Sequence, residues 1–242
     1  MLITIVNHNC NDNAVELISG FRSCGEVLAI DSGSNLAEPY QNYFDLKLPN
    51  VYYANLLNIA CQELKNKFQY SLLYFICSDV KISNYQLTIR YAEEAFTNPD
   101  VGIYAPACNN SGHPQMQCKK TNKIRPVVFV EGFCFAIRLS LLQQLCPVNT
   151  QVNYVGWGLD VYLAYLAFKN KLQSVVDDRI IVEHDSPCGY SLDLARQQRN
   201  NWFSLQSQEA QWFRRLTSVQ VLKSAFGVQL CNLIFAGKNN CK

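Results

Sequence analysis

The sequence predicts an α/β fold with a mostly parallel central sheet flanked by helices. Short apolar segments alternate with segments of helical periodicity over the first 190 residues, a pattern typical of parallel sheets whose strands are joined by helices. One segment, 70–76, is almost wholly apolar, as expected for a strand buried on both faces. Of the 242 residues, 49% are hydrophobic and 17% are charged, which is enough apolar material for a large core.

The predicted strands are apolar and β-branched, whereas the predicted helices have apolar residues three and four positions apart. In the first hundred residues we expect a strand at 2–6, a helix at 13–22, a strand at 26–30, a helix at 50–67, a strand at 70–76 and a helix at 85–95. The strand at 26–30 stops at Asp31-Ser-Gly-Ser34, a composition typical of turns.

The second part of the chain continues the alternation. We expect a strand at 101–105, a strand at 127–130 that continues through 132–138, a helix at 141–145, a helix beginning near Asp160, and short strands at 174–176 and 180–182. Residues 108–125 are polar and predict a long mobile loop. Its basic residues can act as a diphosphate clamp, but a solvated loop is the simpler interpretation.

We expect one domain over residues 1–190 and a helical extension over residues 191–242, packed on or near the acceptor side of the site proposed below. The net charge of the whole chain is only +2, which argues against a nucleic-acid partner. The extension, however, has seven Lys and Arg against two Asp and Glu. This basic surface is consistent with peripheral contact with a membrane, an acidic acceptor or a homodimer contact, although a solvated helical face is the simplest explanation.

The apolar start of the chain, 1–6, lacks the basic residues that open a secretory signal, so we expect a first strand and a cytoplasmic protein. No apolar run reaches the roughly 18 residues that span a bilayer. The eleven cysteines include no C-x-x-C pair, and only three histidines are present, which argues against a structural zinc site. Cys61, Cys77 and Cys134 lie in apolar runs and are predicted to be reduced core residues.

Acidic and polar residues gather where predicted strands end, at Asp31–Ser34, Cys77–Asp79 and Glu183–Asp185. Open α/β sheets bind ligands along that edge. In addition, a glycine-rich segment, Tyr154-Val-Gly-Trp-Gly-Leu-Asp160, delivers a carboxylate to the start of an apolar helix. The positive end of a helix favours an ionised carboxylate, and glycines allow the backbone to approach a ligand. Asp160 is therefore a candidate catalytic group, with a helix N-cap as the structural alternative.

Taken in order, these segments resemble the inverting glycosyltransferases of the GT-A fold, of the family 2 type. The resemblance covers roughly residues 2–190 and lies in Ile3–Asn9, Leu28–Ser34, Tyr74–Asp79, Val130–Arg138, Gly156–Asp160 and Val182–His184. It implies a single GT-A (Rossmann-like) domain that moves a sugar from a nucleotide-sugar donor to an acceptor hydroxyl, in glycan or polysaccharide biosynthesis. The donor would be a UDP-, GDP- or dTDP-sugar, and the acceptor a glycan, a lipid-linked molecule or a protein.

The resemblance also assigns roles to residues. Asp160 is the expected catalytic base. Asp79 and His184 are the expected ligands of Mn²⁺ or Mg²⁺, cations that prefer the oxygens of carboxylates and phosphates. The residues expected to bind the nucleotide are Asn7, His8, Asn9, Asp31, Ser34, Asn58, Ser78 and Asp79. Those expected to bind the acceptor or sugar are Glu131, Gly132, Trp157 and Gly158. Each has a structural alternative, such as an Asx turn for Asp31, core packing for Trp157 and a solvent-facing side chain for Asn58.

Two positions depart from the pattern of the family. Cys77 stands where the metal motif usually has a carboxylate, and Leu159 stands where the base motif usually has an acid. A non-catalytic relative that binds a nucleotide-sugar or a glycan is therefore the alternative function. A nucleotidyltransferase is disfavoured, because residues 7–13 after the first strand contain no glycine and no Lys or Arg.

Overall fold

The computed structural model describes residues 1–185 and 190–218. The strands are β1 (Leu2–Asn7), β2 (Val27–Ser32), β3 (Leu46–Leu48), β4 (Leu72–Cys77), β5 (Val80–Lys81), β6 (Val101–Cys108), β7 (Ile124–Val127), β8 (Cys134–Arg138) and β9 (Gln173–His184). The helices are α1 (Asn11–Arg22), α2 (Glu38–Gln41), α3 (Tyr52–Asn66), α4 (Tyr85–Phe96), α5 (Leu139–Leu145), α6 (Leu159–Lys169), α7 (Leu192–Ser204) and α8 (Gln208–Ser218).

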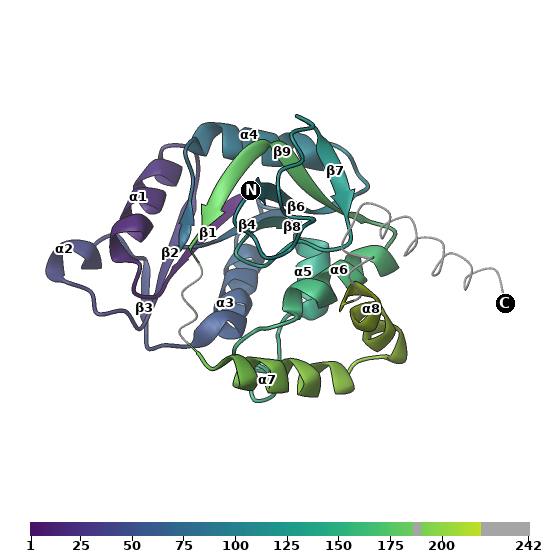
Figure 1. Ribbon diagram of the computed structural model, residues 1–242. Helices are drawn as coiled ribbons and strands as arrows, with labels where there is room; N and C mark the ends of the chain where they lie inside the picture. Colours follow the sequence, from purple (N-terminus) through teal and green to yellow (C-terminus); the bar gives the residue numbers. More distant parts are fainter. Residues whose placement is uncertain (186–189, 219–242) are drawn as a thin grey trace.

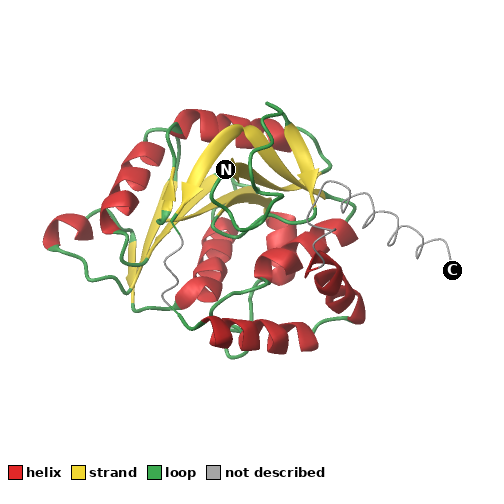
Figure 2. Cartoon of the chain, viewed as in Figure 1, coloured by secondary structure: helices red, strands yellow, loops and turns green. Residues whose placement is uncertain are grey.

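The strands form one mixed sheet in the order β3-β2-β1-β4-β8-β6-β9-β5, with β7 paired to β9. The first four strands of this order are parallel to one another, and β6 is parallel to β9. Strand β8 lies antiparallel between β4 and β6. Helices α1 and α4 cover one face of the sheet, and α3, α5 and α6 cover the other (Figures 1 and 2). The predicted α/β fold with a largely parallel sheet is confirmed.

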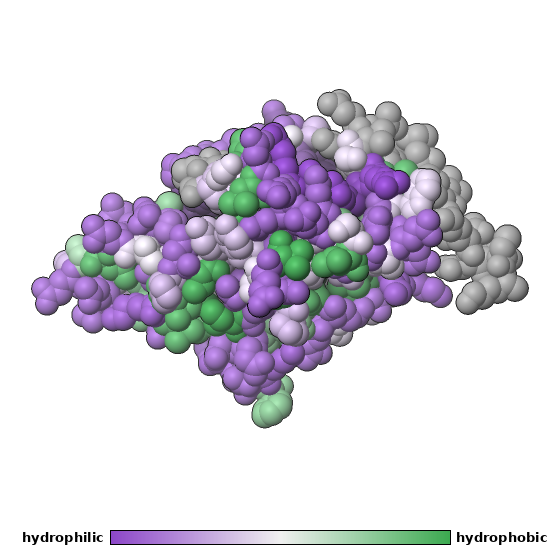
Figure 3. All heavy atoms as spheres, turned by 90° about the horizontal axis from the view of Figure 1, so that it is seen from below, coloured by the Kyte–Doolittle hydropathy of each residue, from purple (hydrophilic) through white to green (hydrophobic). Residues whose placement is uncertain are grey.

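The C-terminal helices share the core of the sheet domain. Helix α6 is apolar on nearly all sides because it packs against β6 and β9 on one side and α8 on the other. The ring of Tyr162 contacts those of Trp202 and Phe203, and the ring of Tyr165 contacts that of Phe213. Seen from the side of α7, the surface is mainly hydrophilic, with smaller hydrophobic areas between (Figure 3).

Two strand predictions were wrong in their bounds. In the segment predicted as one strand through 127–138, only Val127 belongs to β7, residues 128–133 form no strand, and residues 134–138 form β8, which has a different place in the sheet from β7. The two short strands predicted at 174–176 and 180–182 form the single strand β9, with a register shift near Asp177. The polar residues between them looked like a loop, but their charges are paired inside the strand. Asp177 lies 2.8 Å from Arg179, and Asp178 lies 3.0 Å from Arg125.

The polar segment predicted as a loop has no helix or strand over residues 109–123. It is anchored to β9 through Asp178, whose carboxylate accepts hydrogen bonds from the Lys119 backbone and the Thr121 hydroxyl. Cys61 and Cys134 are buried as predicted, Cys77 is partly exposed, and the described cysteines are free thiols. Within the described residues, no helix has the length and apolar composition of a membrane span.

Candidate active site

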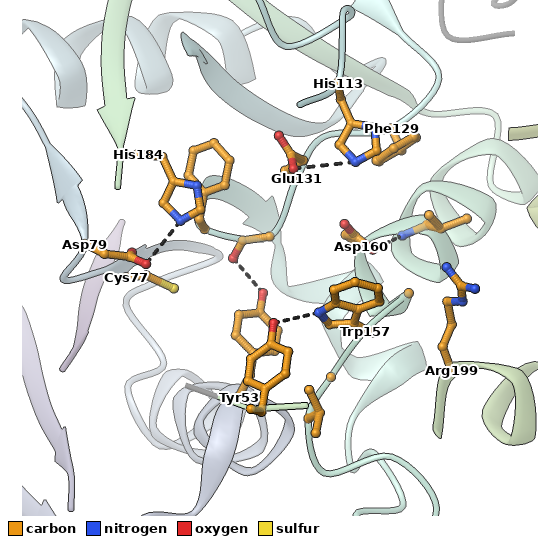
Figure 4. A pocket seen from close by; sticks show the side chains of 17 residues that line it. Tyr53, Cys77, Asp79, His113, Phe129, Glu131, Trp157, Asp160, His184 and Arg199 are labelled. Carbon is orange, nitrogen blue, oxygen red and sulfur yellow. Dashed lines mark hydrogen bonds and ion pairs between the residues drawn. The ribbon is translucent and has the colours of Figure 1, made fainter. Parts of the chain in front are cut away.

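A cavity of about 580 Å³ lies beside the end of β4 and the start of α6 (Figure 4). It brings together residues that are far apart in the sequence. The expected site residues that line it are Asp79, Glu131, Gly132, Trp157, Gly158, Asp160 and His184. Those that do not line it are Asn7, His8, Asn9, Asp31, Ser34, Asn58 and Ser78. The cavity thus contains the expected metal ligands, the expected base and the expected acceptor residues, but most of the expected nucleotide contacts lie outside it.

Asp79 and His184 form one end of the cavity. Asp79 lies in the turn between β4 and β5, and β5 pairs with the end of β9 so that Val80 is opposite His184. His184 Nε2 lies 3.2 Å from Asp79 Oδ2. The imidazole also stacks on the Phe133 ring, with centroids 4.0 Å apart. The second oxygen, Asp79 Oδ1, is buried and has no hydrogen-bond partner among the described residues.

This end has part of the ligand set for a divalent cation. A buried carboxylate oxygen without a partner is costly, and a bound cation would supply that partner. Cys77 is a poor member of such a set, because hard cations such as Mn²⁺ and Mg²⁺ favour oxygen over sulfur. No group of three or more His, Cys, Asp or Glu side chains converges within the described part of the chain. The residues present fit a cation whose other ligands are donor phosphates and water.

The polar ends of β1, β2 and β4 are tied to one another beside the cavity. Buried Asn7 connects them, because its Nδ2 lies 2.9 Å from Asp31 Oδ1 and its Oδ1 accepts a 2.8 Å hydrogen bond from the Ser78 hydroxyl. Asp31 is 2% exposed, and its other oxygen accepts from the Ser34 backbone N–H. In the described structure, Asp31 therefore organises the turn that follows β2.

Three further expected nucleotide residues lie apart from this network or at its surface. His8 and Asn9 are exposed at the sheet edge, where His8 Nδ1 lies 2.6 Å from the Ser32 carbonyl oxygen. Asn58 lies on α3 and forms two hydrogen bonds with the backbone of Val148, at 2.7 and 3.1 Å. Its side chain thereby holds the segment after α5 and is not directed to the cavity.

Asp160 lies at the other end of the cavity. Gly158 is the N-cap residue of α6, and both Gly156 and Gly158 have positive φ angles, of 88° and 85°. Asp160 is consequently in the first helical turn, where its Oδ1 accepts a 2.8 Å hydrogen bond from the Val161 N–H. Burial raises the pKa of Asp160 to about 6, and the negative charge of Glu131 adds to this effect. A base with a pKa close to the working pH is well suited to proton transfer.

Glu131 faces the cavity near Asp160 and has two partners. It accepts a hydrogen bond from the Ser111 hydroxyl, and its Oε1 lies 3.5 Å from His113 Nε2. Burial raises the pKa of Glu131 above its ordinary value. His113 in turn contacts the Phe129 ring edge to face. Neither His113 nor Phe129 was expected in the site, because His113 lies in the segment predicted as a polar loop and Phe129 in one predicted as an apolar strand.

Tyr53 is a second site residue that the sequence did not indicate. Its hydroxyl donates a 2.7 Å hydrogen bond to the Gly132 carbonyl oxygen. A Cβ added at Gly132 would lie 2.5 Å from that hydroxyl, and one added at Gly156 would lie 2.5 Å from the Tyr53 ring. Both glycines therefore leave room for Tyr53. In the sequence, Tyr53 is not distinguished from the other apolar residues of the predicted helix. Trp157 is held by a 2.6 Å hydrogen bond from its Nε1 to the Tyr190 hydroxyl.

No protein-family model and no curated protein matches the sequence, but solved structures do. The fold is similar to that of GalNAc-T7 with UDP, GalNAc and Mn²⁺, with a TM-score of 0.62 and 12% identity. The similarity covers 90% of this chain and 50% of the GalNAc-T7 chain. The chain thus spans half the length of that protein. It is also similar to the mannosyltransferase PcManGT from Pyrobaculum calidifontis in complex with GDP-Man and Mn²⁺, with a TM-score of 0.60, 13% identity, and coverage of 96% and 74%. The chain has a GT-A-like fold. Identities this low establish the fold alone.

Proposed function

We propose that this protein is an inverting glycosyltransferase of the family 2 type, which uses a nucleotide-sugar and a divalent cation. The observation that supports this most strongly is that Asp79 and His184 line the same cavity as Asp160, at its opposite end (Figure 4). Such an arrangement provides one place for the diphosphate of a donor and another for the hydroxyl of an acceptor. Both structural neighbours are complexes that contain a nucleotide and Mn²⁺.

The donor would lie with its diphosphate at the Asp79 end. Asp79 and His184 would hold the cation, which when bound supplies charge neutralisation for the leaving diphosphate. His8, Asn9 and the turn organised by Asp31 and Ser34 would flank the nucleoside, because they lie at the same sheet edge. The nucleotide would be a uridine, guanosine or thymidine diphosphate.

The acceptor would lie at the Asp160 end. The carboxylate of Asp160 removes the proton from the acceptor hydroxyl while that oxygen forms a bond to the anomeric carbon. The bond between the anomeric carbon and the diphosphate oxygen breaks, and the nucleoside diphosphate leaves with the electron pair. A single displacement of this kind inverts the configuration. Trp157 offers an apolar surface beneath a sugar ring, and Glu131 and the Gly132 backbone border the same space.

A non-catalytic relative that binds a nucleotide-sugar or a glycan is the second candidate function. It is favoured by Cys77, since a neutral thiol occupies the position where the family has a carboxylate. Such a protein would bind the donor without turning it over.

Donor turnover distinguishes the two functions. UDP-, GDP- and dTDP-sugars are each incubated with the protein, Mn²⁺ and a mixture of glycan and lipid-linked acceptors, and release of the nucleoside diphosphate is measured. We expect one donor to be consumed, and Asp160→Asn to abolish its consumption. Binding of a nucleotide without release by the folded wild-type protein would contradict the enzyme proposal and favour the non-catalytic relative.

A further inference from the structure

Arg199 of α7 enters the Asp160 end of the cavity, although it lies outside residues 2–190, where the sequence resembles the glycosyltransferases (Figure 4). Its aliphatic stem passes over Gly158, where an added Cβ would lie 2.9 Å from Arg199 Cγ. Its guanidinium carbon lies 5.9 Å from the centroid of the Trp157 ring. The absence of a side chain at Gly158 therefore allows the guanidinium to reach the cavity.

The charge of Arg199 has no counter-ion within the described structure. Arg199 forms no ion pair or hydrogen bond with any described residue, and its Nε is buried without a partner. The neighbouring charges on α7 and α8 include Arg196 and Arg214, which are also positive. Asp160 attracts Arg199 from beyond the distance of an ion pair. Burial together with Arg196 lowers the pKa of Arg199, although a guanidinium stays charged at neutral pH.

An unpaired, partly buried guanidinium with like-charged neighbours is destabilising unless a ligand supplies the opposite charge. The contact with Trp157 is a cation–π interaction, which leaves the buried Nε–H of the guanidinium unmatched. The donor diphosphate is not the ligand that Arg199 needs, because Asp79 and His184 lie on the opposite side of the cavity (Figure 4). The anion is therefore expected on the molecule that contacts Trp157 and Asp160.

We propose that Arg199 binds an anionic substituent of the acceptor, so that the acceptor is an acidic saccharide bearing a carboxylate or a phosphate. This inference rests on the proposed function, because it takes the Asp160 end as the acceptor side. The planar fork of a guanidinium matches both anions with two parallel hydrogen bonds. A sugar ring lying on Trp157 would present a hydroxyl to Asp160 and its charged substituent to Arg199.

The test measures saccharide binding without nucleotide, by nuclear magnetic resonance titration. The probes are methyl β-D-glucuronide with a carboxylate, glucose 6-phosphate with a phosphate, and the neutral methyl β-D-glucoside. The proteins are the wild type, Arg199→Gln, Arg199→Lys and the control Arg196→Gln. Arg196 is on the same helix, but it is exposed and paired with Asp193 at 2.9 Å.

We expect at least one anionic probe to bind the wild type about tenfold more tightly than the neutral glucoside. Arg199→Gln should remove this preference, Arg199→Lys should retain part of it, and Arg196→Gln should leave it unchanged. The probe that is preferred identifies the carboxylate or the phosphate as the natural substituent. Equal binding of all three probes, or a preference that survives Arg199→Gln, would overturn the inference.

Failure of the acceptor inference can be distinguished from failure of the proposed glycosyltransferase function. Binding of UDP or GDP with Mn²⁺ is measured on the same variants, and we expect Arg199→Gln to leave it unchanged because the diphosphate lies at the other end of the cavity. If the nucleotide binds but no anionic saccharide is preferred, only the acceptor inference fails. If Arg199→Gln weakens the nucleotide instead, Arg199 belongs to the donor side and the inference also fails.

Discussion

The buried position of Asp160, the proposed base, carries a cost to the folded state. Its pKa is raised from 3.8 to about 6, so the folded protein disfavours the ionised carboxylate. Compared with a protein that has a neutral side chain at this position, the free energy of unfolding therefore falls as the pH rises from about 4 to about 6. The loss is complete above that range. Active sites often carry such a cost, since function requires the charged form.

Asp160→Asn should separate the two effects. We expect transfer to be lost while metal-dependent nucleotide binding is retained, because the amide cannot accept a proton but still fills the site. We also expect the free energy of unfolding at neutral pH to increase by about 1–3 kcal/mol. Denaturation at pH 7 and at pH 3.5 tests this, because the gain should disappear at the lower pH, where Asp160 is protonated in both states. A variant that is less stable at both pH values would contradict this account of the carboxylate.

The same pKa predicts the pH dependence of activity. A general base works only when it is deprotonated, so kcat/KM should rise with pH and level off above about pH 6. The profile is measured with the donor identified by turnover, in buffers of constant ionic strength. An acidic limb with a midpoint near pH 4 would indicate a carboxylate in water and would count against Asp160 as the base.

The glycine-rich segment before α6 determines the position of Asp160. At Gly156, an added Cβ would lie 2.5 Å from the Tyr53 ring, and the φ of 88° is itself unfavourable for other residues. We expect Gly156→Ala to lower the free energy of unfolding by about 2 kcal/mol or more and to reduce transfer by displacing Asp160. Gly112→Ala is the control, since a Cβ there meets no atom within 4 Å. Equal stability of the two variants, measured by chemical denaturation, would show that Tyr53 does not constrain the segment.

The sequence predicted the elements better than their places in the sheet. Local patterns located most of the strands and helices, because apolar periodicity reflects which side of an element is buried. They did not separate β7 from β8, since half of β7 lies in the polar segment 108–125 and the apolar residues that follow it continue toward β8. They also divided β9 at Asp177 and Asp178, because adjacent charged residues in a sequence are typical of a loop. The ion pairs that allow these charges inside a strand are visible only in the folded chain.

The candidate site was likewise predicted in part. Asp79, His184 and Asp160 come from segments that resemble a family, and the structure brings all three to one cavity. Tyr53 and Arg199 were missed because one looks like a core residue and the other like a solvated charge on an amphipathic helix. Their importance depends on contacts with Gly132, Gly156 and Gly158, which only the folded chain brings near.

At the scale of the whole molecule, α7 and α8 belong to the core that supports the site. Phe203 is 1% exposed and packs on Tyr162 of α6 and against Gly158. We expect Phe203→Ala to lower the free energy of unfolding of the entire protein by about 3–5 kcal/mol in one cooperative transition. Leu205→Ala is the control, because Leu205 on the same segment is 68% exposed. A main transition that is insensitive to Phe203→Ala would show that the C-terminal helices are a separate unit.

The central claim is that a divalent cation and a nucleoside diphosphate bind together at the Asp79 end of the cavity. Calorimetric titration with UDP, GDP, dTDP and CDP, each with and without Mn²⁺, tests it most directly. The variants are Asp79→Ala and the control Asp185→Ala, whose exposed carboxylate is paired with Lys81 at 2.6 Å. We predict that one nucleotide binds only with Mn²⁺, that Asp79→Ala removes this binding and that Asp185→Ala retains it. No binding of any nucleotide by the folded wild type, or metal-dependent binding that survives Asp79→Ala, would contradict the claim.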